Sequence, residues 1–292
     1  MKVSDLLREG ASGLQEAGVE WAASESAKIF ALACGKGWGE VSLWQALDLE
    51  VSQVAGRGEV SRFEFLLEKR KLRIPLQHLS RKAPFASLEL EVGPGVFIPR
   101  PETETMSKAA SDFLSGRKDP LMVDLCAGSG AVGLEVCRAC KVGCFEVEKM
   151  PLPFRFLQKN ISRLRKSFFS GSLCVPVKGD ALLPSTLPFL SGRADCVTSN
   201  PPYLSKVEQP EASFDPPEAL FGGGKRGTEF ICRLLPACCR LLKKGGLCII
   251  EHESAQSREV ASLFRRAGFK GVETLKDLSG RERFTQGVKW QI

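Results

Sequence analysis

The tetrapeptide Asn200-Pro201-Pro202-Tyr203 is the pattern with the clearest chemical meaning in this sequence. It follows an expected strand at 194–199, and two consecutive prolines cannot continue a central strand, so the chain must stop at the rim of the sheet. Prolines have a fixed backbone angle and no amide hydrogen, which holds the neighbouring carbonyls in place. The Asn200 carboxamide oxygen and a rigid carbonyl can then accept both hydrogens of one planar NH2 group, and Tyr203 offers a flat face beside it.

A second pattern, Gly128-Ser129-Gly130, begins a glycine-rich loop. Glycines let backbone amides approach a ligand closely, and Glu148, about 20 residues further on, can accept hydrogen bonds from both ribose hydroxyls. The arrangement suits a dinucleotide and equally S-adenosylmethionine. Asp124, just before the loop, favours S-adenosylmethionine because its carboxylate can receive the ammonium group, although a turn cap is the alternative. Asp180 can accept from an adenine amino group, with a simple Gly-Asp turn as its alternative.

Together these patterns indicate methyl transfer from a sulfonium to an amide nitrogen. The amide lone pair is delocalised into the carbonyl, so the nitrogen is a weak nucleophile. Two acceptors that hold both hydrogens would localise the lone pair and direct it at the methyl group, which is catalysis by positioning and electrostatics. No strong base is required when the proton leaves after the nitrogen has become cationic, so we assign no catalytic role to His78 or His252.

Short apolar runs alternate with helical patterns from about residue 119 onward. Such alternation predicts a mostly parallel sheet covered by helices on both faces, and ligands bind these sheets beyond the carboxyl ends of the strands. We expect a helix at 129–140 and strands at 121–126, 143–147, 173–178, 194–199, 246–251, 271–276 and 283–290.

The region before this sheet divides into two parts. Apolar residues at helical spacing predict helices in residues 1–80, with Pro75 ending the helical pattern, and we interpret this stretch as a substrate-recognition domain. Alternation at 85–92, a turn at 93–95 and a resumed strand at 96–98 predict a β-hairpin. We therefore expect a hairpin bridge at 81–104 that leads into a catalytic domain at 105–292.

Composition excludes several classes of protein. With 292 residues of which 43% are hydrophobic, the chain can bury a real core. No apolar run reaches the roughly 18 residues of a membrane-spanning helix and no signal peptide is visible, so we expect a cytoplasmic protein without membrane attachment. The 11 cysteines indicate reduced thiols. Cys137, Cys140 and Cys144 are of a metal-ligand type, but two histidines and no second Cys-x-x-Cys pair lead us to expect no metal.

The two motifs together resemble those of amino-group methyltransferases acting on adenine, cytosine or glutamine. The segment Ile98-Pro99-Arg100-Pro101-Glu102-Thr103-Glu104 is similar to the signature of the release factor glutamine methyltransferases, and the resemblance extends over roughly residues 60–292. It implies N5-methylation of the glutamine in the Gly-Gly-Gln loop of peptide chain release factors, with S-adenosylmethionine converted to S-adenosylhomocysteine. It also implies a Rossmann-like class I methyltransferase sheet, mostly parallel with an antiparallel last strand. We expect a monomer, although no sequence pattern specifies the oligomeric state.

The resemblance also implies roles for the matching positions. The cofactor would be bound by Asp124, Cys126, Ala127, Gly128, Ser129, Gly130, Glu148, Asp180, Ala181 and Asn200. The glutamine would be held by Asn200, Pro201, Pro202 and Tyr203, with Asn200, Pro201 and Tyr203 acting in catalysis and Arg100, Glu102 and Glu104 shaping the lid of the pocket. The chain departs from the family at Cys126 and Glu253, where glycines are usual, and at Glu148, where aspartate is more frequent.

Three other functions remain open at this point. An adenine-N6 nucleic-acid methyltransferase shares the acceptor tetrapeptide, but the net charge of +7 is a modest surplus, so we do not expect direct nucleic-acid binding. A nicotinamide-dependent oxidoreductase would use the same glycine loop and leave Asn200-Pro201-Pro202-Tyr203 unexplained. A non-catalytic binding protein on the same fold is the third.

Overall fold

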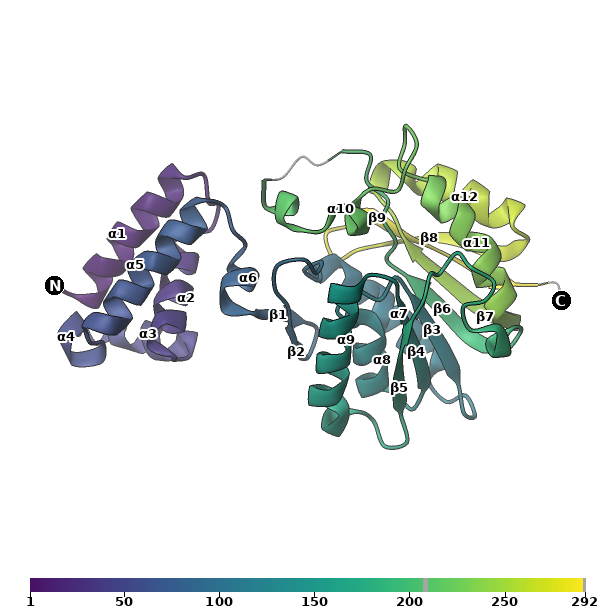
Figure 1. The fold of residues 1–292 in the computed structure, drawn as a ribbon, viewed down its shortest axis with the longest axis horizontal. Helices are drawn as coiled ribbons and strands as arrows, with labels where there is room; N and C mark the ends of the chain where they lie inside the picture. Colours follow the sequence, from purple (N-terminus) through teal and green to yellow (C-terminus); the bar gives the residue numbers. More distant parts are fainter. Residues whose placement is uncertain (207–209, 291–292) are drawn as a thin grey trace. The chain divides into compact units, whose positions relative to one another are not determined.

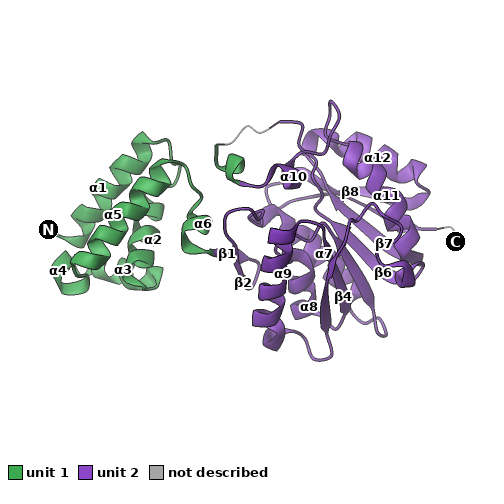
Figure 2. Ribbon diagram, viewed as in Figure 1, with its two compact units in different colours: residues 1–81, 209–214 green, residues 82–208, 215–292 purple. Residues whose placement is uncertain are grey.

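The computed structural model describes residues 1–206 and 210–290, which form two compact units (Figure 2). The first unit comprises residues 1–81 and the 3-10 turn Pro210–Phe214, and the second comprises the remaining described residues. Within the described ranges, no helix is both long and apolar enough to cross a membrane.

The first unit is a helical bundle. Its helices are α1 (Val3–Glu16), α2 (Ala22–Cys34), α3 (Trp38–Ala46), α4 (Val51–Val54), α5 (Arg57–Lys71) and α6 (Leu76–Ser80). Phe30 lies in its core and makes edge-to-face contacts with Phe63 and Trp44, whose ring centroids lie 5.3 and 6.1 Å from its own. The helical pattern continues past Pro75, because a proline is well tolerated just before the first helical turn and α6 begins directly after it.

The hairpin differs from the prediction. Strands β1 (Lys82–Phe85) and β2 (Leu88–Glu91) pair antiparallel around a turn at 86–87, and residues 93–95 and 96–98 form no part of it. Ala86 adopts a φ of 48°, and its amide donates to Oε1 of Glu104 at 2.8 Å. A tertiary contact therefore stabilises a turn that has no glycine, and the hairpin belongs to the second unit.

The second unit contains a seven-stranded sheet in the order β5-β4-β3-β6-β7-β9-β8, in which β9 is antiparallel to both of its neighbours (Figure 1). The mostly parallel sheet and its expected strands are confirmed. The strands are β3 (Leu121–Leu125), β4 (Gly143–Glu148), β5 (Leu173–Lys178), β6 (Ala194–Ser199), β7 (Leu242–Glu251), β8 (Phe269–Lys276) and β9 (Glu282–Lys289).

Helices cover both faces of the sheet (Figure 1). On one face lie α7 (Glu104–Leu114), α8 (Ala131–Ala139) and α9 (Pro151–Leu164), and on the other lie α11 (Glu229–Leu241) and α12 (Ser257–Arg266), while α10 (Pro217–Leu220) is a single turn. Successive strand residues face opposite sides: Met122 packs with the first group and Val123 with the second. The central strands are therefore buried on both faces, as their continuous apolar runs predict.

The order of the strands reverses between β3 and β6. The chain runs from β3 outward through β4 to β5 and then returns to β6 on the other side of β3. In sheets of this kind, a crevice for ligands opens beyond the carboxyl ends of the strands at such a reversal.

Candidate active site at the ends of β3, β4 and β6

A cavity of about 280 Å³ lies at this position in the second unit. Most of the predicted site residues line it: Asp124, Cys126, Ala127, Gly128, Ser129, Glu148, Asp180, Ala181, Asn200 and Pro202. The predicted residues Gly130, Pro201, Tyr203, Arg100 and Glu102 do not line it. Several apolar residues to which no site role was assigned complete the wall: Phe97, Pro99, Phe221 and Phe230.

The loop between β3 and α8 places two glycines in different surroundings. Gly128 has a φ of 58°, and a methyl group added there would meet no atom within 4 Å, so its backbone faces open cavity. Gly130 has a φ of 88° and begins α8, and an added methyl would lie 2.6 Å from Cδ1 of Leu157. The side of Gly130 on which a side chain would stand is therefore filled by packing beneath the loop. Cys126, at the family's usual glycine position, has a φ of 62°.

Glu148 is held by the loop whose conformation it stabilises. Its Oε2 accepts the amide of Gly128 at 2.9 Å, and its Oε1 accepts the amide of Met150 at 2.6 Å. Burial raises the pKa of the Glu148 carboxyl, and these backbone donors limit the rise. Each oxygen keeps a second lone pair, so the carboxylate can still accept two hydroxyl groups from a ligand.

The two other predicted carboxylates differ in burial. Asp124 is 3% exposed and its Oδ1 accepts the hydroxyl of Thr198 at 2.6 Å; burial raises the pKa of its carboxyl. Asp180 lies nearer the surface, accepts the amide of Leu182 at 2.9 Å and pairs with Lys149 at 3.0 Å. Both line the cavity, Asp124 at the end of β3 and Asp180 after β5.

Backbone contacts fix the chain after β6. The amides of Tyr203 and Leu204 both donate to the carbonyl of Leu220, at 3.1 and 2.8 Å, and the side chain of Gln256 donates to the carbonyl of Tyr203 at 2.7 Å. Asn200 is thereby held at the cavity while Pro201 is buried beside it. No sequence pattern points to Gln256, because it lies more than fifty positions away from the motif it stabilises.

The hydroxyl of Tyr203 has a buried partner. Its hydroxyl donates to Oε1 of Glu251 at 2.9 Å, and burial together with the nearby carboxylate raises the pKa of the phenol well above its usual value. The hydrogen bond to Glu251 fixes the ring at the end of β6, and its role beside a substrate stays a prediction. The apolar walls are formed by residues such as Phe97 and Phe221.

The expected lid residues have structural partners elsewhere. Arg100 donates to Asp215 at 2.7 Å, Glu102 pairs with Arg283 at 3.4 Å, and Glu104 accepts the hairpin amide of Ala86. From the same segment, Phe97, Pro99 and Thr103 line the cavity. The segment therefore contributes to the wall through residues other than the charged ones.

Two further expectations concern Glu253 and the histidines. Glu253 has an ordinary extended backbone, with φ −69° and ψ 145°, and pairs with Arg283 at 2.9 Å, so the absence of glycine leaves the local geometry undisturbed.

His252 is buried with Nε2 2.8 Å from Oγ1 of Thr285, and burial lowers its pKa. Neither His78 nor His252 lines the cavity.

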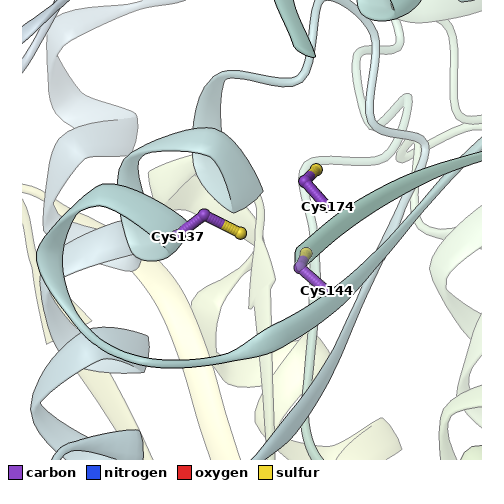
Figure 3. A group of neighbouring side chains, drawn as sticks. All are labelled: Cys137, Cys144 and Cys174. Carbon is purple, nitrogen blue, oxygen red and sulfur yellow. The ribbon is translucent and has the colours of Figure 1, made fainter. Parts of the chain in front are cut away.

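The structure groups the cysteines differently from the sequence spacing. Cys137 on α8, Cys144 on β4 and Cys174 on β5 are buried with their sulfur atoms within 4.8 Å of one another (Figure 3), and Cys140 is not in this group. Cys174 joins because it is the cross-strand partner of Cys144 in the parallel pair of β4 and β5. None of the three lines the cavity.

Comparisons with known proteins place the chain among methyltransferases. Residues 86–215 match a family model described as "Conserved hypothetical protein 95". A release factor glutamine methyltransferase from Bifidobacterium longum is 37% identical over 99% of this chain and 100% of its own, and one from Corynebacterium glutamicum is 34% identical over 99% of both. The solved structure of a methyltransferase from Pyrococcus furiosus covers 70% of this chain and 91% of its own at 20% identity, with a TM-score of 0.51, and shares the fold.

Proposed function

Since the chain belongs to the release factor glutamine methyltransferases, we propose that it methylates the side-chain amide nitrogen, N5, of the glutamine in the Gly-Gly-Gln loop of peptide chain release factors. The methyl donor is S-adenosylmethionine, which supplies an electrophilic methyl group on a sulfonium. The observation that carries the proposal is that Asn200 and Glu148, the polar groups suited to the substrate amide and to a ribose, line one cavity.

The residues present fit the donor. At Gly128 the cavity begins directly against the backbone, and Glu148 presents two oriented oxygens whose outer lone pairs are available to ribose hydroxyls. Asp124 offers a carboxylate for an ammonium group, and Asp180 with Ala181 lies where the adenine would contact the loop after β5. The cavity therefore offers polar partners for the ribose, the base and the ammonium group of a nucleoside that carries an amino acid.

Asn200, which lines the cavity, and the carbonyl of its buried neighbour Pro201 would together hold the substrate amide. Both oxygens accept hydrogen bonds, so together they bind the two hydrogens of one NH2 group and place the nitrogen lone pair toward the cavity. Pro201 and Pro202 are buried and the following amides are tied to Leu220, so the acceptors do not reorganise during reaction. The proton then leaves a cationic nitrogen, for which a strong base is not needed.

The remaining expectations extend the same proposal. We assign recognition of the release factor to the helical unit, and we expect a monomer that acts in the cytoplasm, where translation factors are found. Direct nucleic-acid binding is not expected. The family favours the glutamine reaction over adenine-N6 methylation of nucleic acid.

The test is to incubate the purified enzyme with S-adenosylmethionine and a release factor and to map methylation by mass spectrometry, with DNA and RNA in parallel reactions. A single methyl group on the Gly-Gly-Gln glutamine is expected, and Asn200→Ala should abolish it while S-adenosylmethionine still binds by calorimetry. Methylation of nucleic acid alone would refute the proposal, as would full turnover by Asn200→Ala.

A further inference from the structure

Asn200 is connected by hydrogen bonds to two residues that the proposed mechanism does not use. Its Nδ2 lies 3.4 Å from Oγ1 of Thr103, and that hydroxyl lies 2.7 Å from Oε2 of Glu251. The second carboxylate oxygen, Oε1, accepts the hydroxyl of Tyr203 at 2.9 Å. Glu251 is fully buried and Thr103 is 3% exposed, so solvent does not compete for these groups.

The chemistry of these groups fixes the direction of each hydrogen bond. An ionised carboxylate can only accept, so both hydroxyls must donate to Glu251. A threonine hydroxyl has one hydrogen, and at Thr103 that hydrogen is directed at Glu251. Oγ1 can therefore only accept from Asn200, which requires the NH2 group of the carboxamide to face Thr103. The oxygen Oδ1 lies in the same plane on the opposite side of the Cβ–Cγ axis and therefore points away from Thr103.

We propose that Thr103 and Glu251 are positioning residues that hold Asn200 in the one orientation in which its oxygen faces the substrate. This inference rests on the proposed function. A carboxamide turned over by 180° has the same shape but presents a donor in place of the acceptor. Such a donor repels the NH2 group of glutamine and attracts the carboxylate of glutamate. The network therefore sets selectivity for glutamine over glutamate as well as the rate.

The substitution Glu251→Gln tests this directly, because it preserves shape and adds one donor. The hydroxyl of Tyr203 donates to Oε1 of residue 251, so the oxygen of the new glutamine stays at that position. Its NH2 group then takes the Oε2 position and donates to the hydroxyl of Thr103. The hydroxyl of Thr103 must then donate to Asn200, which turns the carboxamide over. The prediction is a change in which substrate is preferred, and a purely structural role for Glu251 would not produce it.

Two threonines provide matched variants. Thr103→Val removes the hydroxyl with little change in shape, and Thr103→Ser restores it. Thr105 lies two positions further along the same segment, and its buried Oγ1 has no hydrogen-bond partner among the described residues. Thr105→Val is therefore the control for loss of a buried threonine hydroxyl at this place.

The experiment measures kcat and KM for a release factor, the Kd of that factor and of its glutamine-to-glutamate form, and the Kd of S-adenosylmethionine, at about pH 8.5, where Glu251 is ionised. Glu251→Gln should lower kcat at least about tenfold and reduce the preference for glutamine over glutamate by a similar factor, because an unmatched polar group is rejected strongly. Thr103→Val should lower both kcat and the preference for glutamine, though less than Glu251→Gln does. In Thr103→Ser and Thr105→Val, both quantities should stay within about twofold of wild type. The Kd of S-adenosylmethionine should be unchanged throughout.

An unchanged kcat and unchanged glutamine preference in folded Glu251→Gln would overturn the inference. Should that variant fail to fold, equal activity of Thr103→Val and Thr103→Ser would overturn it instead. A wild-type enzyme that methylates no release factor would refute the proposed function itself, which is a separate and prior result.

Discussion

Gly128 and Gly130 should respond differently to alanine, although both have positive φ angles, 58° and 88°. A side chain in this conformation costs about 1 kcal/mol. At Gly128 the added methyl meets no atom within 4 Å, so the free energy of unfolding should fall by about 1 kcal/mol only. At Gly130 the methyl would lie 2.6 Å from Leu157 and 2.9 Å from Leu134. Overpacking of this kind adds about 1–3 kcal/mol, so the total loss should be about 2–4 kcal/mol.

Urea unfolding and titration with S-adenosylmethionine separate these effects. Gly128→Ala should stay folded and lose at least about tenfold in affinity, because its methyl group occupies the cavity that the donor needs. Gly130→Ala should unfold at lower urea and bind the donor normally at low temperature, where it is folded. The reasoning fails if Gly128→Ala binds S-adenosylmethionine like wild type, or if the two variants lose equal stability.

Three other outcomes follow from the structure. Glu148→Ala should weaken S-adenosylmethionine binding about 10–100-fold and change kcat at saturation much less, since charged hydrogen bonds are lost far from the transferred methyl; a large fall in kcat at unchanged Kd would contradict this. Burial raises the pKa of Glu251 to about 7 from 4.5, with the nearby carboxylate of Glu102 adding to the rise and the donors Thr103 and Tyr203 and the charge of Arg283 opposing it. The folded state therefore holds this proton more tightly than the unfolded state. The free energy of unfolding of wild type should fall by about 3 kcal/mol relative to that of Glu251→Gln as pH rises from about 4.5 to 7. If urea unfolding shows that the difference between the two proteins does not change with pH, the raised pKa is excluded. Arg70 is 5% exposed and pairs with Glu25 and Glu211, so Arg70→Met should cost about 3 kcal/mol in urea unfolding. The exposed pair of Lys71 and Glu68 should cost less than about 1 kcal/mol in the matched Lys71→Met, and equal losses would refute the distinction.

The sheet could be predicted because its signals are local. The central strands β3 and β6 are short apolar runs buried on both faces, and helical patterns separate most of the strands, so periodicity predicts where β3 to β7 lie along the chain. The hairpin could not be placed in the same way. A turn at 93–95 has the favourable residues Gly93-Pro94-Gly95, yet the chain turns at Ala86 because Glu104, distant in sequence, accepts its amide.

In the candidate site, too, local patterns predict some features and residues distant in sequence decide the others. The loop from Cys126 to Gly130 and the motif from Asn200 to Tyr203 are contiguous, so their positions at strand ends follow from the strand prediction. What each residue faces does not follow. Gly130 packs against Leu157 and the Tyr203 hydroxyl contacts Glu251, and both partners come from other elements. The cysteine group shows the same limit, because strand register brings in Cys174 where chain spacing suggested Cys140.

The orientation of Asn200 is the point at which this limit affects function. The four-residue motif places a carboxamide at the rim of the sheet. The two orientations of this carboxamide, related by a rotation of 180°, differ only in whether the oxygen or the NH2 group faces the substrate. That difference is decided by Thr103 and Glu251, about 100 and 50 positions away, and by the rule that an ionised carboxylate accepts and never donates. Any chain that keeps the tetrapeptide but replaces the buried acid with a donor should therefore hold the same cavity with reduced ability to bind an amide. The acid at the end of β7 is then as important for binding a substrate NH2 group as the tetrapeptide itself.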